Sequence, residues 1–139
     1  TLDRSSAASD VYKRQIVQII SAHMVSDFGL RMFRISASEA ERFPALAREY
    51  YEAGPLLLRQ QLVRYLRQCV ERGELRIPDL DLAADQLIEL ASVSIHDRAL
   101  FLGSGAVDKD ILRKVNSAAV QMFLAYYGGA KTAYAMAAE

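Results

Sequence analysis

The chain has 139 residues, a length typical of one domain, and 52% of them are hydrophobic, enough for a core without disulfides. Its 17 basic residues balance its 17 acidic residues, which argues against nucleic-acid binding by this chain alone. The single cysteine, Cys69, excludes an internal disulfide framework and suits a reducing cytoplasm. No apolar run reaches the roughly 18 residues of a membrane span and no signal-peptide pattern is present, so we expect no membrane partner and a cytoplasmic location.

The first 15 residues differ in character from the rest of the chain. Residues 1–9 (T-L-D-R-S-S-A-A-S) are small and polar and have no period. Residues 10–15 (D-V-Y-K-R-Q) resemble the in-frame translation of the transposon end used to prepare sequencing libraries. We therefore expect residues 1–15 to be a non-native or disordered leader. A genuine polar N-terminal arm is the alternative.

The remaining chain has apolar residues three and four apart, which is the period of a helix, and no alternating strand pattern. We expect an all-α fold, a bundle of five to six helices, over residues 16–129, followed by an alanine-rich tail over residues 130–139. The expected helices span residues 16–25, 27–42, 45–53, 55–72, 82–102 and 108–127. The first of these reads as the end of a helix that began upstream. Ser26 or Asp27, and Asp79 or Asp81, carry the side chains of N-caps.

Two prolines divide the middle of the chain. Pro44 ends the preceding helix and starts a short one, because proline lacks an N–H and disfavours the helical conformation of the residue before it. Gly54 is expected to cap that helix in a left-handed conformation, and Pro55 to start the next helix. In the short helix, Tyr50 and Tyr51 lie about 100° apart, so we expect only one of them, Tyr50, to point inward.

The search for reactive groups is mostly negative. His23 has only Asp27 at a helical ligand spacing, and the carboxylate next to His96 points elsewhere on a helix, so no metal site is expected. Cys69 lies in an apolar stripe without a neighbouring histidine, which favours an inert buried thiol. No P-loop, dinucleotide fingerprint or nucleophile elbow is present. We therefore expect no enzyme and no cofactor.

Four short motifs carry a resemblance to a known family. Residues 39–55 read E-A-E-R-F-P-A-L-A-R-E-Y-Y-E-A-G-P, and residues 72–76 read R-G-E-L-R. Residues 81–87 read D-L-A-A-D-Q-L, and residues 123–128 read F-L-A-Y-Y-G. In this order and spacing they resemble the C-terminal domain of TetR/AcrR-type transcriptional regulators. The resemblance extends over about residues 16–129.

The resemblance implies a homodimer that binds a small-molecule effector and controls release from an operator. Members of this family carry an N-terminal helix-turn-helix domain, and no such segment is present in this sequence. We therefore expect the chain to be a fragment that meets DNA only through the missing domain. The alternative function is a helical protein-interaction domain with no small-molecule site, which predicts a filled core with no cavity larger than about one water molecule.

The dimer is expected to use a smooth apolar face of the helix at 82–102 and a second face of the last helix. The residues expected at this interface are Ala84, Ile88, Ala91, Ile95, Ala99, Asn116, Val120, Phe123 and Tyr127. Substitution of Ile88 or Ile95 by aspartate is then expected to abolish dimerisation. The alternative is that both faces are buried inside a single chain.

The resemblance also implies an effector pocket among the middle helices, and ligand pockets are mainly apolar with a few polar groups. The candidate residues are Phe28, Met32, Tyr50, Tyr65, Cys69, His96 and Phe101, with Tyr51 as a further candidate. Tyrosine hydroxyls and the imidazole would orient a ligand, and Met32 would form an adaptable wall. The alternative for each of these residues is an ordinary core position.

Overall fold

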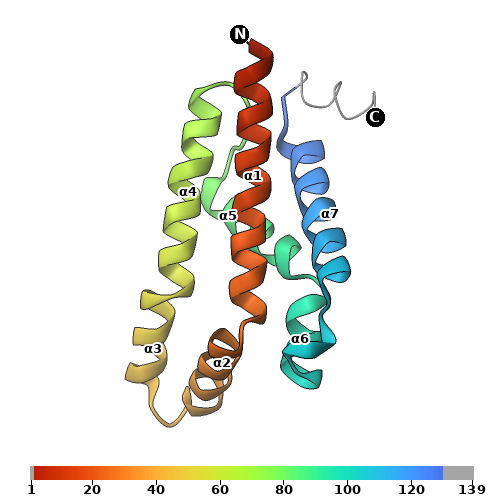
Figure 1. The fold of residues 1–139 in the computed structure, drawn as a ribbon. Coiled ribbons are helices and arrows are strands. Elements are labelled where there is room, and N and C mark those ends of the chain that lie inside the picture. Colours follow the sequence, from red (N-terminus) through yellow and green to blue (C-terminus); the bar gives the residue numbers. More distant parts are fainter. Residues whose placement is uncertain (1, 130–139) are drawn as a thin grey trace.

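The structure, a computed structural model, describes residues 2–129 and, for side chains, residues 12–129. Its described part contains seven α-helices and one 3₁₀ turn, which confirms the all-α prediction (Figure 1). The elements are α1 (Leu2–Val25), α2 (Asp27–Glu39), α3 (Pro44–Ala53), α4 (Pro55–Glu71), α5 (Leu80–Ser92), α6 (Ile95–Leu102), η1 (Ser104–Ala106) and α7 (Lys109–Tyr127). The predicted alanine-rich tail, 130–139, lies outside the described residues.

The first helix is longer than the sequence led us to expect. α1 begins at Leu2, so residues 2–15, expected as a leader, form its first part in the structure. The ring of Tyr12 packs edge-on against that of Tyr65, with 5.1 Å between centroids, and the Lys13 amino group lies 3.4 Å from a carboxylate oxygen of Glu74. The suggestion that residues 10–15 are not native to the protein stays a prediction.

The helix starts follow the capping signals in the sequence. Ser26 caps α2, because its Oγ accepts a hydrogen bond from the Gly29 backbone nitrogen at 3.0 Å. Asp79 caps α5 through Leu82 in the same way, and Asp108 caps α7. These contacts satisfy amide groups that have no partner inside their own helix.

Pro44 and Pro55 are the first residues of α3 and α4, as predicted. The conformation of Gly54 differs from the expected left-handed cap, since its φ is −118° and its ψ is −87°. The reason is that Gly54 both ends α3 and begins α4. Its nitrogen donates to the Tyr50 carbonyl at 3.0 Å, and its own carbonyl accepts from the Leu58 nitrogen at 3.0 Å.

The single helix predicted over residues 82–102 is two helices in the structure. α5 ends at Ser92, and Ser94 adopts a left-handed conformation with a φ of 64° before α6 begins at Ile95. The break redirects the chain, so that α6 packs beside α2 and the start of α7 rather than continuing α5 (Figure 1). The prediction of one continuous helix is therefore wrong.

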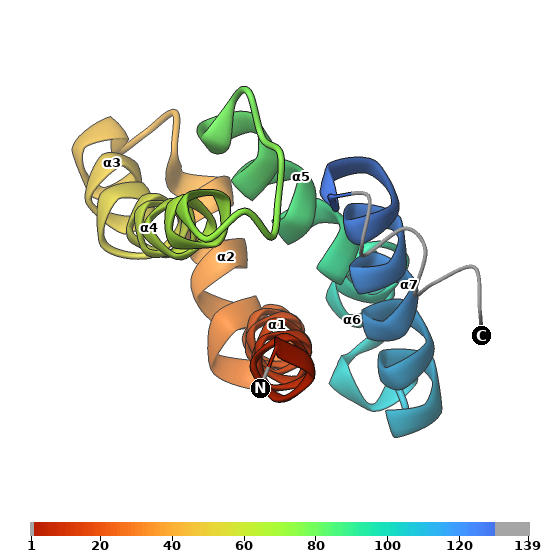
Figure 2. The ribbon, with the colours of Figure 1, turned by 90° about the horizontal axis from the view of Figure 1, so that it is seen from above.

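The helices enclose two hydrophobic cores at opposite ends of the molecule. Seen from above, the pair α3–α4 lies on one side of α1 and the pair α6–α7 on the other (Figure 2). In that view α5 lies across from α1, between the two pairs. The upper core consists of Val17, Ile20, Leu62, Val63, Leu66, Cys69, Leu75, Ala83, Ala84, Leu87, Ala91, Ala119, Val120, Phe123, Leu124 and Tyr127. The lower core consists of Leu30, Ile95, Ala99 and Val107, with Val25, Leu100, Ile111, Leu112 and Val115 packed against it.

The connector between α4 and α5 is fixed to the end of α7. Leu75 and Gly128 form an isolated antiparallel bridge, and the Arg76 nitrogen donates to the Tyr127 carbonyl at 2.8 Å. Gly73, with a φ of 76°, makes the turn out of α4. The connector therefore closes one end of the upper core.

Candidate functional site

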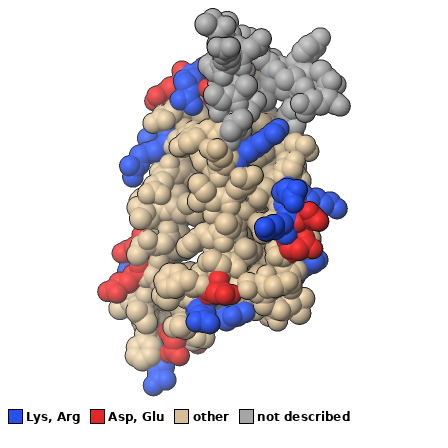
Figure 3. All heavy atoms as spheres, viewed as in Figure 1, with Lys and Arg blue, Asp and Glu red and all other residues tan. Residues whose placement is uncertain are grey.

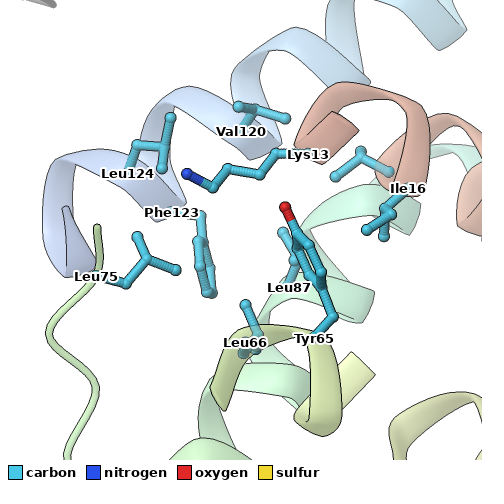
Figure 4. Close-up of a pocket in the computed structure, with 10 residues that line it drawn as sticks. Lys13, Ile16, Tyr65, Leu66, Leu75, Leu87, Val120, Phe123 and Leu124 are labelled. Atoms are coloured by element: carbon cyan, nitrogen blue, oxygen red, sulfur yellow. The ribbon is translucent and has the colours of Figure 1, made fainter. Parts of the chain in front are cut away.

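A hollow lies inside the upper core, between α1, α4, α5 and α7 (Figure 4). Its lining residues are Lys13, Ile16, Val17, Tyr65, Leu66, Leu75, Leu87, Val120, Phe123 and Leu124. Its free volume is about 10 Å³, which is about enough for one water molecule. In this conformation the helices therefore leave no room for a larger ligand.

The polar groups of the hollow are few. Tyr65 on α4 directs its hydroxyl toward the middle of the lining residues, and the Lys13 amino group lies on the opposite side (Figure 4). Lys13 belongs to the segment that we expected to be a leader, and the other lining residues all lie within 16–129. Tyr65 is the only polar side chain in that part of the lining. Chemically, the hollow offers apolar walls, one phenol group and the amino group of Lys13.

Cys69 lies one turn beyond Tyr65 and is completely buried. Burial raises the pKa of its thiol, although the Tyr65 hydroxyl and the charges of Lys13 and Arg72 act in the opposite direction. The Arg72 Nη2 atom lies 3.5 Å from the sulfur and donates to it. The thiol therefore stays protonated and inert at neutral pH, as the sequence suggests.

The other predicted pocket residues do not meet at this hollow. Phe28 on α2 and Phe101 on α6 are 71% and 80% exposed. Tyr50 is half-buried and burial raises the pKa of its hydroxyl, whereas Tyr51 is exposed, which agrees with the prediction that Tyr50 is the inward one. The structure thus divides these candidates among different places in the fold.

Two candidates lie near the lower half of the molecule. Met32 is half-buried on α2. His96 on α6 packs edge-on against the Phe33 ring of α2, with 4.9 Å between ring centroids. This contact joins α2 to α6 and leaves the imidazole outside the hollow.

The sequence missed most of the residues that line the hollow. They are the leucines, the isoleucine and the valines at ordinary helical core spacing, together with Leu75 of the connector. Nothing in their spacing separates a cavity wall from a filled core. Val120 and Phe123, which we expected at a dimer interface, also line it.

The residues expected at the dimer interface lie inside the single chain. Ile88 is half-buried against the upper core, and the remaining eight are buried. The chain's own helices cover this face, so these side chains offer almost no area to a second copy. The physical reason is the small size of the alanines, which lets α5 and α6 approach their neighbours closely.

A different apolar surface remains open on α6 and α7. Phe101 and Leu102 end α6, and Met122 and Tyr126 lie four residues apart on α7, with Tyr126 80% exposed. The two helices are neighbours on one side of the molecule (Figure 2). We use the name α6–α7 face for these four exposed residues, of which Phe101 and Leu102 lie at the end of α6 and Met122 and Tyr126 in the last two turns of α7. The four-residue spacing places Met122 and Tyr126 on one side of α7, about 100° round the helix from the buried Phe123 and Tyr127.

Charges and metal ligands give no further site among the described residues. In the view of Figure 3, basic side chains (blue) and acidic side chains (red) are mixed along the margins of the molecule, and uncharged residues cover its middle. No group of three or more histidine, cysteine or acidic side chains in residues 12–129 is placed to hold a metal ion. A membrane-crossing helix is likewise not found in the described part of the chain.

Comparisons with known proteins assign this helical domain to a family. The family model of the AefR-like transcriptional repressor, C-terminal domain, matches residues 14–129. The chain is therefore a domain of a transcription regulator, a class of protein without enzymatic activity. More narrowly, the chain belongs to the AefR-like C-terminal domains of the TetR regulators. A comparison with curated proteins gives no match.

Two solved structures share the fold. A protein of Mesorhizobium loti MAFF303099 assigned to the TetR-family transcriptional regulators has a TM-score of 0.72 and 22% identity, over 91% of this chain and 71% of that one. The flavonoid-responsive regulator FrrA has a TM-score of 0.63 and 28% identity, over 70% of this chain and 50% of that one. This chain therefore matches half the length of FrrA.

Proposed function

We propose that this domain senses a small apolar or aromatic effector and pairs with a second copy, within a regulator whose operator release the effector controls. The observation that carries the effector site is the Tyr65 hydroxyl directed into a hollow with apolar walls (Figure 4). Ligand sites of this kind combine apolar surface with a few polar groups that fix orientation. Family membership and the two structural neighbours support the regulatory role.

The effector must separate the helices before it fits. The free volume of about 10 Å³ is far below the roughly 300 Å³ of a typical ligand pocket. Ile16 and Val17 of α1 form part of the wall, so an occupant of the hollow displaces α1. A ligand that binds the open state more tightly than the closed one shifts the population toward the open state. In the whole regulator, α1 then carries the change toward the operator.

A flavonoid is the first probe to test, because one structural neighbour is flavonoid-responsive. Isothermal titration calorimetry with a flavonoid panel should give binding to the unaltered chain. Tyr65→Phe, which removes only the hydroxyl, should weaken that binding about tenfold through loss of one hydrogen bond. Tyr51→Phe is the matched control on an exposed ring and should bind normally. Equal flavonoid affinity of the two variants would show that the Tyr65 hydroxyl does not contact the ligand.

A domain that binds proteins and no small molecule is the second candidate. The near-filled core favours it, since a hollow with room for about one water molecule is what that function predicts. Absence of binding heat across the probe panel would support it over the effector site.

Pairing is proposed through the α6–α7 face rather than through the residues first expected. A symmetric pair requires an exposed, self-complementary surface, and large exposed apolar side chains of α6 and α7 supply one. Met122→Asp should convert a dimer into a monomer in light scattering after gel filtration. Gln121→Asp, one residue away on the exposed side of α7, is the control. A dimer mass for Met122→Asp would contradict the proposed face.

A further inference from the structure

Three buried polar side chains lie where the chain passes between the two cores. Among residues 12–129 the buried polar side chains are Ser21, Ser36, Ser92 and Asn116. Of these, Ser21 lies on α1, Ser92 ends α5, and Asn116 lies on α7, and the three helices all pack against one another. We call Ser21, Ser92 and Asn116 the polar layer. Each has at most 9% of its surface exposed.

Along the chain, each polar residue stands between a residue packed in the upper core and a residue packed in the lower core. Ser21 follows Ile20 of the upper core and precedes Val25, which packs on the lower core. Ser92 follows Ala91 and precedes Ile95 of α6. Asn116 separates Val115, beside the lower core, from Ala119 of the upper core. Along the chain, each polar residue therefore lies where the packing passes from one core to the other, and on α1 Met24 still packs against the upper core beside Val25.

The polar layer contributes little to joining the helices. The Ser21 hydroxyl donates to the Gln18 carbonyl at 3.1 Å, and that of Ser92 to the Ile88 carbonyl at 2.9 Å, so both donors are used within their own helices. Asn116 Oδ1 is buried and accepts no hydrogen bond from the described residues. A buried oxygen without a donor weakens the packing around it.

The lower part of the molecule is held together by its own contacts. Arg34 of α2 donates to the Leu100 carbonyl of α6, and the Ser104 hydroxyl donates to Asp27 Oδ1 at 2.8 Å. With the lower core, these contacts bind α2, α6 and η1 to one another. The chain enters α6 through the left-handed residue Ser94, where the helix is already broken. We call α2, α6 and η1 the lower unit.

We propose that the lower unit opens cooperatively before the upper core does, with the polar layer as the boundary between them. Proteins open in contiguous units whose opening free energies differ, and elements that respond to ligands come from the less stable units. A ligand or partner that prefers either state of the lower unit then biases the whole domain. This inference stands whether or not the Tyr65 hollow binds an effector.

Native-state hydrogen exchange on the whole chain tests the proposal directly. Amides of α2 and α6 should exchange together, with one shared denaturant dependence, at least about tenfold faster than the protected amides of α4 and α5. Convergence of all four helices on one opening reaction in the unaltered protein would overturn the proposal without any variant.

A matched pair of variants then tests the polar layer. Asn116→Leu replaces the amide whose Oδ1 accepts no hydrogen bond from the described part of the chain by an apolar side chain, and should slow exchange of α2 and α6 about tenfold relative to α4 and α5. Ser117→Leu adds the same side chain one residue further, on the exposed side of α7, and should leave the ratio unchanged. An identical effect of both variants, or slowing of all helices alike, would contradict the assigned boundary. Should Asn116→Leu fail to fold, the exchange pattern of the unaltered chain remains decisive.

Discussion

Ser26 and Gly29 together close the junction between α1 and α2. The Ser26 Oγ atom accepts from the Gly29 nitrogen at 3.0 Å and donates to the His23 carbonyl at 2.9 Å. A Cβ atom at Gly29 would lie 2.5 Å from that carbonyl oxygen and 2.9 Å from Ser26 Oγ. Glycine is therefore required here for space, and the angle between α1 and α2 depends on it.

Gly29→Ala should destabilise the chain by about 1–3 kcal/mol, the usual cost of forcing an extra methyl group into a packed site. The clash is with backbone, which moves less easily than a side chain. Urea unfolding followed by far-ultraviolet circular dichroism measures the change. Gly105→Ala is the control, since a Cβ there would meet no atom within 4 Å. Equal stability of the two variants would show that the junction relaxes without cost.

Ile95→Asp should unfold the domain rather than only separate a dimer. Ile95 is completely buried in the lower core, and an unpaired carboxylate there loses both apolar burial and solvation. We expect a loss of more than about 3 kcal/mol in urea unfolding. Arg98→Asp, at an exposed position of α6 outside the α6–α7 face, is the control for stability. A stably folded monomer from Ile95→Asp would restore the interface first expected from the sequence.

Cys69 should react with thiol reagents only when the upper core opens. Its side chain is fully buried, and burial raises the pKa of the thiol, so little reactive thiolate exists at neutral pH. The reaction with a chromogenic disulfide should be at least about a hundredfold slower in the folded chain than in 6 M guanidinium, because reaction needs the open state. Rapid reaction of the folded chain would show that α4 does not pack as described.

Stability should fall as the pH rises above 10. Burial, and secondarily the neighbouring Tyr126 and Asp79, raise the pKa of Tyr127 above its ordinary value of 10.0. The folded state therefore favours the neutral phenol. The resulting stabilisation is complete below pH 10 and is lost as the pH rises through the folded-state pKa.

Tyr127→Phe should flatten this alkaline loss, although it also removes the hydrogen bond that the Tyr127 hydroxyl donates to Gln86. That bond contributes about 1 kcal/mol at neutral pH. Urea unfolding at pH 8, 9.5 and 11 gives both quantities from one series. An equal alkaline loss in the variant would assign the effect to other groups, such as Tyr50, whose pKa burial also raises.

The helix starts were predictable because local chemistry sets them. Pro44 and Pro55 begin helices wherever the chain is placed, and Ser26, Asp79 and Asp108 satisfy amides only a few residues away. The break at Ser94 was missed since residues 92–95 hold neither glycine nor proline. Packing of Ile95 and Ala99 against α2 overrides the local helical preference there.

The side of each helix that faces the core was less predictable than the helix itself. α7 has two apolar sides, one with Val120 and Phe123 and one with Met122 and Tyr126, and periodicity does not rank them. Only the packing of α1 and α5 decides which side is buried. For the same reason the sequence identified Tyr65, which has a polar group, but not the apolar walls around it.

Gly54 joins α3 and α4 so closely that the two helices should move together as one bent helix. Hydrogen bonds run through it without a gap, from Tyr50 to Gly54 and from Gly54 to Leu58, and α3 continues the line of α4 toward α2 (Figure 1). Because no loop separates the two helices, a displacement of α3 at the lower end of the molecule also displaces α4. Tyr65 lies further along α4, so α3 and α4 together connect α2 of the lower unit, which α3 contacts, to the hollow.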